Sequence, residues 1–340
     1  GGHSLAAVRV FSRIEEVFGK TLPIAALFES PTIEALASRI KEQITAERSC
    51  VVEIQRGSRG VPIFFVHGIG GNVVGFRDLA RLLGPDRPVY GIQARGLYDD
   101  EPPDSSIEVM AAHYVSAIRA VRPEGPFALA GLSFGGVVAF EMARQLKAAG
   151  SQVALLALLD AWALGSHRLL PTSIHVRRFI SLLGRRAVYH TGNLIRARGR
   201  QRFAYVASRM RTLRRRARST AWRTGLRLYA ALGRFHPADA GSTTDLPRRF
   251  RDVAENLRLA AKRYTPQPYS GPAVLLRARE TPAIFMRDPA FGWTGLVKSL
   301  SIREVPGSHV TMLSEPNVRA LAAELRRSLD SAQEAIERVP

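Results

Sequence analysis

The sequence contains very little cysteine and no long hydrophobic run. Cys50 is the one cysteine among 340 residues, which excludes an internal disulfide and a cysteine cluster for a metal ion. No apolar run approaches the roughly 18 residues that a membrane-spanning helix needs. We therefore expect a protein with no metal site and no membrane span, in a reducing, cytoplasmic setting.

The chain also lacks an initiator methionine and a signal-peptide pattern, because it begins at Gly1 with no basic start and apolar stretch. We expect a fragment of a longer chain whose natural N-terminus lies upstream. Hydrophobic residues make up 46% of the chain and charged residues 23%. These values are ordinary for a globular protein and exclude the disordered, collagen-like and low-complexity classes.

Acidic residues are missing from one long segment. Residues 167–236 contain 18 arginines and no lysine, aspartate or glutamate, whereas the rest of the chain holds 31 basic and 29 acidic residues. This segment therefore carries nearly all of the formal net charge of +20. Such a stretch can bind phosphate, nucleic acid or an anionic membrane. We favour the simpler interpretation of amphipathic helices with solvated arginines on one face.

The first 60 residues predict two helices and a linker. Apolar residues recur at helical spacing over residues 4–18, which indicates an amphipathic helix. Ser30 and Pro31 predict the N-cap and first turn of a second helix that runs to about Gln43. This part is too short to bury a core alone. Residues 46–60 are polar and predict a linker into an edge strand made by Val51, Val52 and Ile54.

From Val61 onward, short apolar runs alternate with helical segments. The predicted strands are Val61–Val66, Pro88–Ile92, Phe127–Ala130, Val153–Leu159, Ala273–Leu276 and Leu300–Val305. The predicted helices are Phe76–Leu83, Ile107–Val121, Val137–Ala149 and Val318–Glu337. This alternation is typical of a parallel sheet with helices on both faces. About 100 residues of helical character separate the fourth strand from the fifth, so we expect an insertion over one end of the sheet.

The segment Gly131–Gly136, with the sequence GLSFGG, follows a predicted strand and precedes a predicted helix. This is the G-x-S-x-G pattern in the strand–turn–helix context of a nucleophile elbow. A tight turn there projects the Ser133 hydroxyl above the sheet, and glycines at 131 and 135 let strand and helix approach closely. We predict that Ser133 is a catalytic nucleophile.

A serine nucleophile needs a base and an acid that orients the base. Among the eight histidines, His309 is the one that follows the last predicted strand on a loop, so we expect it to be the base. Asp160 ends the strand after the elbow helix, whereas Glu280 and Asp288 follow the next strand. We favour Asp160 as the acid, because a charge at the tip of an apolar strand must face the site edge or be paired.

The tetrahedral intermediate of acyl transfer needs backbone donors for its oxyanion. The backbone N–H of Phe134, the residue after the nucleophile, is one expected donor. The loop His67-Gly68-Ile69-Gly70-Gly71-Asn72 follows the first parallel strand, and we expect the N–H of Ile69 to be the other. A glycine-rich turn without this role is the alternative interpretation of the same loop.

Together these residues resemble the type I thioesterase domain that ends nonribosomal peptide synthetase and polyketide synthase lines. The resemblance covers about residues 61–330 and rests on HGIGG after the first strand, GLSFGG, Leu158-Leu159-Asp160 and Val305-Pro306-Gly307-Ser308-His309. It implies an α/β-hydrolase fold with the acid at Asp160 and a helical lid at about 161–262. Residues 331–340 are left as a C-terminal tail.

The N-terminal segment Gly1-Gly2-His3-Ser4-Leu5 is similar to the attachment motif of an acyl or peptidyl carrier domain. The match continues through Leu22-Pro23 and Leu27–Ile33. The resemblance implies that residues 1–45 are the C-terminal part of a carrier domain and that Ser4 takes a covalent 4′-phosphopantetheine. It also implies upstream synthetase modules as partners.

The resemblance predicts release of a carrier-bound acyl or peptidyl thioester in secondary-metabolite biosynthesis. The acyl group would pass to Ser133 and then to water, giving an acid, or to an internal amine or hydroxyl, giving a ring. The thioesterase chemistry needs no further cofactor. Two alternatives remain: a general serine esterase of small oxoesters, and a nucleic-acid or membrane-binding module that uses the arginine-rich segment. We expect no nucleic-acid partner.

Overall fold

The computed structural model describes residues 4–20, 22, 26, 30, 32–41, 49–97, 101–164, 248–280 and 288–338. The chain divides into two units, one of residues 1–166 with 241–340 and the other of residues 167–240. All described residues belong to the first unit. The arginine-rich segment and most of the expected lid at 161–262 lie outside the described residues.

Two helices precede the sheet. α1 spans Ser4–Phe18, as the helical spacing predicts, and α3 spans Ile33–Lys41. The predicted N-cap at Ser30 is wrong. The Ser30 N–H instead donates to the carbonyl four residues earlier, so this residue closes the preceding turn. Thr32 caps α3, because its hydroxyl accepts a hydrogen bond from the Ala35 N–H at 3.2 Å.

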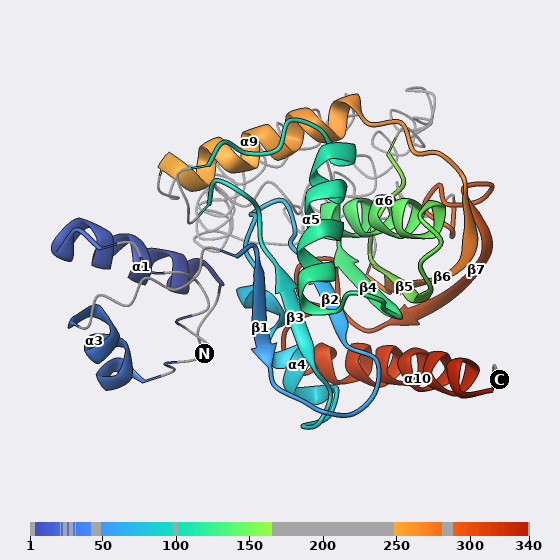
Figure 1. Ribbon diagram of the computed structural model, residues 1–340, viewed down its shortest axis with the longest axis horizontal. Helices are drawn as coiled ribbons and strands as arrows, with labels where there is room; N and C mark the ends of the chain where they lie inside the picture. The colour runs from blue at the N-terminus through green and yellow to red at the C-terminus, as the bar shows by residue number, and fades with distance from the viewer. Residues whose placement is uncertain are drawn as a thin grey trace, which may run out of the picture. The chain divides into compact units, whose positions relative to one another are not determined.

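One seven-stranded sheet forms the body of the protein, in the order β1-β3-β2-β4-β5-β6-β7 (Figure 1). The strands are β1 Val51–Gln55, β2 Ile63–Val66, β3 Val89–Ile92, β4 Phe127–Leu132, β5 Val153–Leu159, β6 Tyr269–Ala278 and β7 Val297–Val305. β1 pairs antiparallel with β3 at one edge, and every other pairing is parallel. The predicted parallel sheet and its edge strand are confirmed.

The central strands are apolar because both faces of the sheet are covered. β2 has the sequence IFFV and is fully buried, and the last five residues of β5 are buried as well. Alternate residues of β2 point to opposite faces. Ile63 and Phe65 belong to the core cluster on one face, which also takes in residues of α4 and α10.

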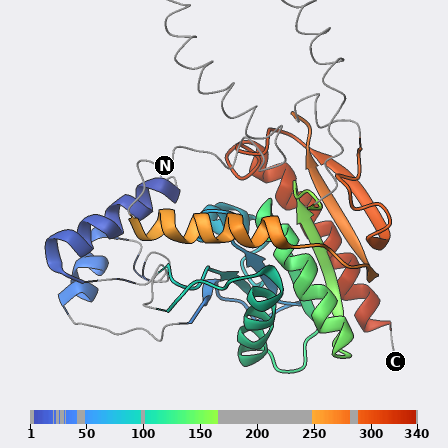
Figure 2. The ribbon, with the colours of Figure 1, turned by 90° about the horizontal axis from the view of Figure 1, so that it is seen from above.

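Helices form the two outer layers. The short 3-10 helix η1 spans Val74–Phe76. The α-helices that follow it are α4 Arg77–Leu82, α5 Ile107–Val121, α6 Phe134–Ala148, α9 Arg248–Arg263 and α10 Asn317–Glu337. α4 and α10 pack together on one face, while α5 and α6 pack together on the other (Figures 1 and 2). The predicted arrangement of helices on both faces is therefore confirmed. None of the described helices is long and apolar enough to cross a bilayer.

Candidate active site

The turn after β4 holds Ser133 in a strained backbone conformation. Ser133 has φ 56° and ψ −120°, a region that L residues rarely adopt. The two glycines around it are required by space, since a Cβ on Gly131 would meet the backbone of Gly135. A Cβ on Gly135 would meet the carbonyl oxygens of Val66 and His67. β4, Ser133 and α6 thus form the tight strand–turn–helix that the sequence predicts.

His309 and Asp160 are far apart in the sequence and in contact in the structure. His309 Nδ1 lies 2.7 Å from Asp160 Oδ2, and both side chains are buried. The other oxygen, Asp160 Oδ1, accepts a hydrogen bond from the backbone N–H of Ala278 at 2.8 Å. A carboxylate only accepts, so Nδ1 of His309 carries a proton and Nε2 of the neutral ring is the basic nitrogen.

Backbone hydrogen bonds hold the three strand ends side by side. The Ser133 N–H donates to the carbonyl of Leu159, the residue before Asp160, at 3.0 Å. The Asp160 N–H in turn donates to the carbonyl of Leu276 in β6 at 2.8 Å. The Arg279 N–H after β6 donates to the carbonyl of Val305 in β7 at 2.9 Å. Ser133, Asp160 and His309, which follow β4, β5 and β7, therefore share the carboxyl edge of the sheet, where open α/β sheets bind ligands.

The other acid candidates have different surroundings. Asp288 accepts hydrogen bonds from the N–H groups of Ala290 at 2.9 Å and Gly292 at 2.6 Å, so its carboxylate closes a local turn. Glu280 is exposed. Among the described carboxylates, the one paired with His309 is that of Asp160.

The chain is clamped where it leaves Asp160. Trp293 Nε1 donates to the Ala161 carbonyl at 2.8 Å, and the Ala163 N–H donates to the Phe291 carbonyl at 2.9 Å. The Trp162 ring stacks on the Phe291 ring with centroids 3.7 Å apart. The loop between β6 and β7 therefore fixes the start of the long insertion.

The loop after β2 packs against the elbow. A Cβ on Gly68 would lie 3.8 Å from the Leu132 carbonyl oxygen, an ordinary contact distance. Among the backbone hydrogen bonds of the described loops and turns, none uses the N–H of Ile69. Phe134 is the first residue of α6, a position whose N–H has no partner four residues earlier in the helix. Both N–H groups lie on segments that meet at the elbow, as an oxyanion-binding pair requires.

Ser4 is the first residue of α1. The predicted attachment residue thus stands at a helix N-terminus, which suits an attached phosphate group because the free N–H groups and the helix dipole favour an anion. Its side chain lies outside the described residues.

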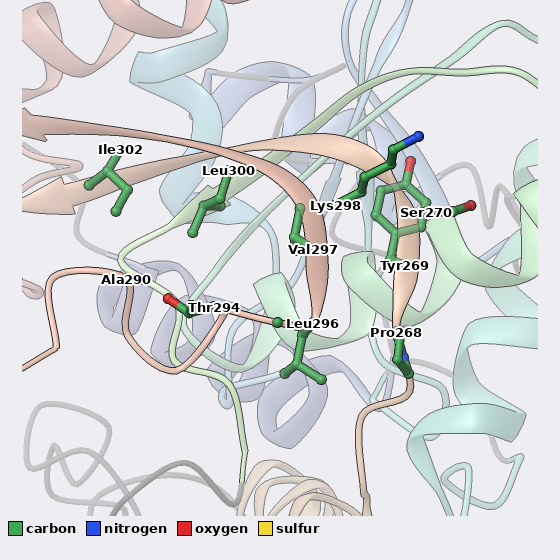
Figure 3. Close-up of a pocket in the computed structure, with 11 residues that line it drawn as sticks. Pro268, Tyr269, Ser270, Ala290, Thr294, Leu296, Val297, Lys298, Leu300 and Ile302 are labelled. Atoms are coloured by element: carbon green, nitrogen blue, oxygen red, sulfur yellow. The ribbon is translucent and has the colours of Figure 1, made fainter.

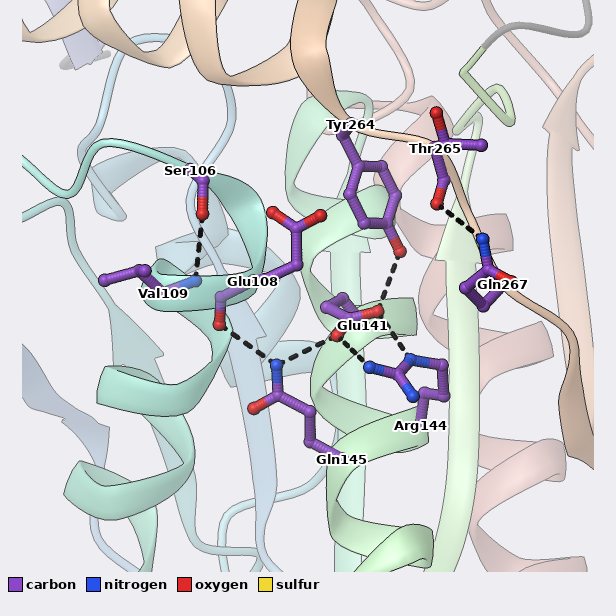
Figure 4. A network of polar contacts seen from close by, with 9 residues as sticks. All are labelled: Ser106, Glu108, Val109, Glu141, Arg144, Gln145, Tyr264, Thr265 and Gln267. Atoms are coloured by element: carbon purple, nitrogen blue, oxygen red, sulfur yellow. Dashed lines mark hydrogen bonds and ion pairs between the residues drawn. The ribbon is translucent and has the colours of Figure 1, made fainter.

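Sequence reasoning missed a buried polar network between α6 and the end of α9 (Figure 4). Glu141 has a side chain that is 1% exposed and accepts two hydrogen bonds from Arg144, at 2.7 and 2.8 Å. It also accepts from Gln145 and from the Tyr264 hydroxyl, each at 2.9 Å. Glu141, Arg144 and Gln145 have the i, i+3, i+4 spacing that brings side chains together on a helix, so the sequence held a signal for this part of the network. It held none for Tyr264.

These contacts set the charge of the network. Burial alone would raise the pKa of Glu141, but hydrogen bonds from Arg144, Gln145 and Tyr264 bring it below its ordinary value. Burial and the nearby Glu141 carboxylate raise the pKa of Tyr264. At neutral pH the network therefore holds a carboxylate, a guanidinium and a neutral phenol, and it ties the chain after α9 to the elbow helix.

A groove of about 730 Å³ lies elsewhere on the sheet (Figure 3). Tyr269, Ser270 and Lys298 line it at the start of β6 and β7. Ser133, Asp160 and His309 follow the carboxyl ends of their strands, so the groove belongs to the opposite edge. The described residues include no cluster of His, Cys, Asp or Glu that could hold a metal ion.

Comparisons with known proteins agree on two parts of the chain. Residues 61–172 match the family described as Thioesterase domain, and residues 1–40 match the Phosphopantetheine attachment site. The chain is 29% identical to chondramide synthase cmdD of Chondromyces crocatus over 349 residues, which covers 99% of this chain and 8% of that protein. It spans between 2% and 17% of the length of eight curated relatives, which include further nonribosomal peptide synthetases.

Solved structures give the same match. A four-domain nonribosomal peptide synthetase bound to AMP and glycine aligns with 100% of this chain and 24% of its own, with TM-score 0.59 and 26% identity. The NocB thioesterase domain from the nocardicin cluster aligns with 80% of this chain and 95% of its own, with TM-score 0.51 and 25% identity.

Proposed function

Because the chain carries a thioesterase domain of α/β-hydrolase fold behind a phosphopantetheine attachment site, of the kind found in nonribosomal peptide synthetases, we propose that it releases an acyl or peptidyl chain from a carrier thioester. Release proceeds through an acyl-enzyme on Ser133. The contact between His309 Nδ1 and Asp160 Oδ2 beside the strained elbow is the observation that supports this most directly.

We propose the domain arrangement that the sequence indicates: a carrier part at 1–45, a linker at 46–60 and the thioesterase domain at 61–330 with a lid at about 161–262. Two bounds need correction: β1 (Val51–Gln55) already belongs to the sheet, and residues 331–337 of the expected tail at 331–340 continue α10. Ser4 would hold the phosphopantetheine, whose thiol presents the acyl group as a thioester. Upstream synthetase modules would load it. Ser4 at the start of α1 supports this assignment.

In the acylation step, the Ser133 oxygen attacks the thioester carbonyl while His309 Nε2 accepts the hydroxyl proton. Asp160 orients the imidazole and stabilises its cationic form, and the N–H groups of Ile69 and Phe134 stabilise the oxyanion. The carbon–sulfur bond then breaks, and the protonated imidazole gives its proton to the departing sulfur. Ser133 is left as an ester of the acyl chain.

In the second step, His309 Nε2 accepts a proton from the incoming nucleophile, which attacks the Ser133 ester. Water gives a free acid, and an amine or hydroxyl of the same acyl chain gives a ring. The Ser133 oxygen then recovers the proton from the imidazole. A positioned general base of this kind contributes roughly 100- to 10,000-fold to the rate.

The test uses the full 340-residue chain and a panel of acyl and aminoacyl thioesters of N-acetylcysteamine, a small thiol that resembles the end of the pantetheine arm. Mass spectrometry should find the acyl group on Ser133, and Ser133→Ala should abolish the adduct. Matched oxoesters should react more slowly, and faster oxoester turnover would favour a general esterase instead. An adduct that persists in Ser133→Ala would reject the nucleophile.

The acid has its own test. Asp160→Asn keeps the acceptor for the Ala278 N–H but presents an amide to His309, which favours the wrong imidazole tautomer. We expect kcat/KM for a thioester to fall by about 1,000- to 10,000-fold. Glu280→Gln is the matched control, because Glu280 is the exposed acid candidate, and it should keep the wild-type value. Equal losses in the two variants would reject Asp160 as the acid.

A further inference from the structure

The buried His67 side chain has two short polar contacts and packs against the Phe134 ring. It is the first residue after β2 and has 0% exposure. Its Nδ1 lies 2.7 Å from the Gly68 carbonyl oxygen and its Nε2 lies 2.7 Å from the Tyr114 hydroxyl. We propose that His67 is a positioning residue that fixes the direction of the Ile69 N–H in the oxyanion hole. This inference rests on the proposed function.

The contacts determine the protonation of the ring. A carbonyl oxygen only accepts, so Nδ1 of His67 must carry a proton and donate it to Gly68. Burial is the largest influence on the pKa of His67 and lowers it to about 4. The Gly68 carbonyl and the nearby Asp104 act in the opposite direction, but by less. The ring is therefore neutral at pH 7, Nε2 is bare, and the Tyr114 hydroxyl donates to it.

The bond to Gly68 controls the neighbouring amide. The Gly68 carbonyl and the Ile69 N–H belong to one planar peptide and point in opposite directions when that peptide is trans. The same carbonyl also accepts the Gly71 N–H at 3.0 Å. Two donors on the carbonyl oxygen hold the peptide plane, so the Ile69 N–H points away from His67.

His67 also touches the segment that carries the other oxyanion donor. Its ring stacks on the Phe134 ring, with centroids 6.0 Å apart and an interplanar angle of 23°. Its backbone carbonyl lies where a Cβ on Gly135 would be. One buried residue therefore sets the orientation of the Ile69 amide and packs against the start of α6, where the Phe134 amide lies.

α5 supplies the support behind the ring. Tyr114 is fully buried in this helix, and its ring lies edge-on to the His67 ring. The Asp104 carboxylate nearby has other partners, because it lies 3.3 Å from His113 Nδ1 and 3.8 Å from the Arg95 guanidinium. The Tyr114 hydroxyl is thus the side-chain group that fixes the Nε2 end of His67.

The experiment compares three variants of the full chain on one N-acetylcysteamine thioester that acylates the wild type. His67→Leu removes both polar contacts and should lower kcat by about 10- to 100-fold with KM within about twofold, since removal of an oxyanion donor itself costs 100- to 1,000-fold. His67→Asn places an amide N–H near the Nδ1 position and should stay within about fivefold of the wild type. Tyr114→Phe should lose about two- to tenfold in kcat.

Circular dichroism and thermal melting measure the folded fraction of each variant. Each kcat is then calculated per folded molecule before the variants are compared. If His67→Leu keeps the wild-type kcat, or if His67→Asn loses as much as His67→Leu, the positioning role is rejected. If His67→Leu does not fold, Tyr114→Phe decides, because a wild-type kcat in that variant contradicts the role of the pair.

A second measurement does not depend on catalysis. Nitrogen-15 NMR of labelled wild-type protein should show His67 with a protonated Nδ1 and a bare Nε2 from pH 5.5 to 8. The opposite tautomer, or a charged ring, would overturn the proposal even if acylation occurs. If no thioester acylates the protein but this NMR pattern is found, the proposed function fails while the His67 geometry stands.

Discussion

At the scale of single residues, the proposed nucleophile and acid are two of the three described non-glycine residues with positive φ, and the third is Phe291 in the clamp after Asp160. Ser133 and Asp160 both have positive φ values, 56° and 43°. Strain of this kind costs of order 1–3 kcal/mol and persists only where the surroundings enforce it. Here the surrounding glycines and the hydrogen bonds from β4 to β5 and from β5 to β6 enforce it. The proposed nucleophile and acid therefore reduce the stability of the fold in order to present their side chains.

This strain can be measured at Ser133. Ser133→Gly should be more stable than Ser133→Ala by about 1 kcal/mol, because glycine adopts φ 56° and ψ −120° readily and alanine does not. Both variants should lack acylation, so the comparison isolates the backbone. Urea denaturation of the two proteins checks it. Equal midpoints would mean that the elbow stores no measurable strain at this position.

The sequence predicts residues best where one position must meet several local requirements. GLSFGG predicts the elbow because strand, turn and helix are adjacent in the chain. His309 was favoured by its place after the last predicted strand and Asp160 as a charge at the tip of an apolar strand, and the structure places them in contact across 149 positions. The pairing of His67 with Tyr114 gave no local signal, because helical periodicity explains Tyr114 as an ordinary core residue.

At the scale of elements, close approach decides how strand, turn and helix fit together. β4 and α6 meet so tightly that side chains at Gly131 and Gly135 have no room. Gly135 also brings α6 against the end of β2, and with it the loop that carries Ile69. The elbow therefore aligns the proposed nucleophile and the proposed oxyanion site in one contact.

Gly131→Ala and Gly135→Ala should each destabilise the fold by more than about 3 kcal/mol or prevent folding, because the new Cβ meets backbone atoms that cannot move. Gly68→Ala is the matched control for folding, since its Cβ would meet one backbone oxygen at 3.8 Å. Soluble expression and thermal melting distinguish them. A Gly135→Ala protein with the melting temperature of Gly68→Ala would show that α6 can shift away from β2.

His67 joins β2 to α5, and this link should depend on pH. Burial lowers its pKa from 6.5 to about 4, so the unfolded chain binds the extra proton first as pH falls. The contribution of neutral His67 to the free energy of unfolding is fully present above pH 6.5. It is lost as the pH falls from 6.5 to 4, by about 3 kcal/mol in total. His67→Asn should lack this component. Urea denaturation at pH 7.5, 5.5 and 4.5 measures the difference, and parallel pH profiles would contradict it.

Element boundaries show where local patterns fail. β6 begins at Tyr269, before Gly271 and Pro272, although these residues predict a turn and the expected strand began at Ala273. The irregular register between Tyr269 and Pro272 accommodates the proline. β7 begins at Val297 rather than Leu300, because an edge strand tolerates polar residues such as Lys298 on its exposed side.

At the scale of the whole molecule, contacts between distant segments connect α9 and the residue after it to α6 and to the loop after β2. The Tyr264 hydroxyl reaches Glu141 across 123 positions. α9 meets the loop after β2, since a Cβ on Gly71 would lie 3.3 Å from the Val253 side chain. No sequence period relates these partners, so they are the part of the fold that sequence patterns do not predict.

Tyr264→Phe should cost about 1 kcal/mol in unfolding free energy, since one buried hydrogen bond to a charged acceptor is lost. Glu141→Gln should cost more, about 2–4 kcal/mol, because it leaves Arg144 without its charged partner. Tyr269→Phe is the matched control, a buried tyrosine outside this network. Chemical denaturation gives the three values. A Tyr264→Phe loss no larger than that of Tyr269→Phe would mean that the network does not stabilise the protein.

The clamp at Ala161–Ala163 and the anchor at Tyr264 have a consequence for diversification. Within the described residues, the side chain of Asp160 bonds to His309 Nδ1 and to the Ala278 N–H at the end of β6. Exchange of residues 165–247 for the corresponding stretch of a relative would keep all the residues that make these two bonds. The clamp and the anchor therefore mark two joints at which an engineered chimera would retain Ser133, Asp160, His309 and the contacts described among them.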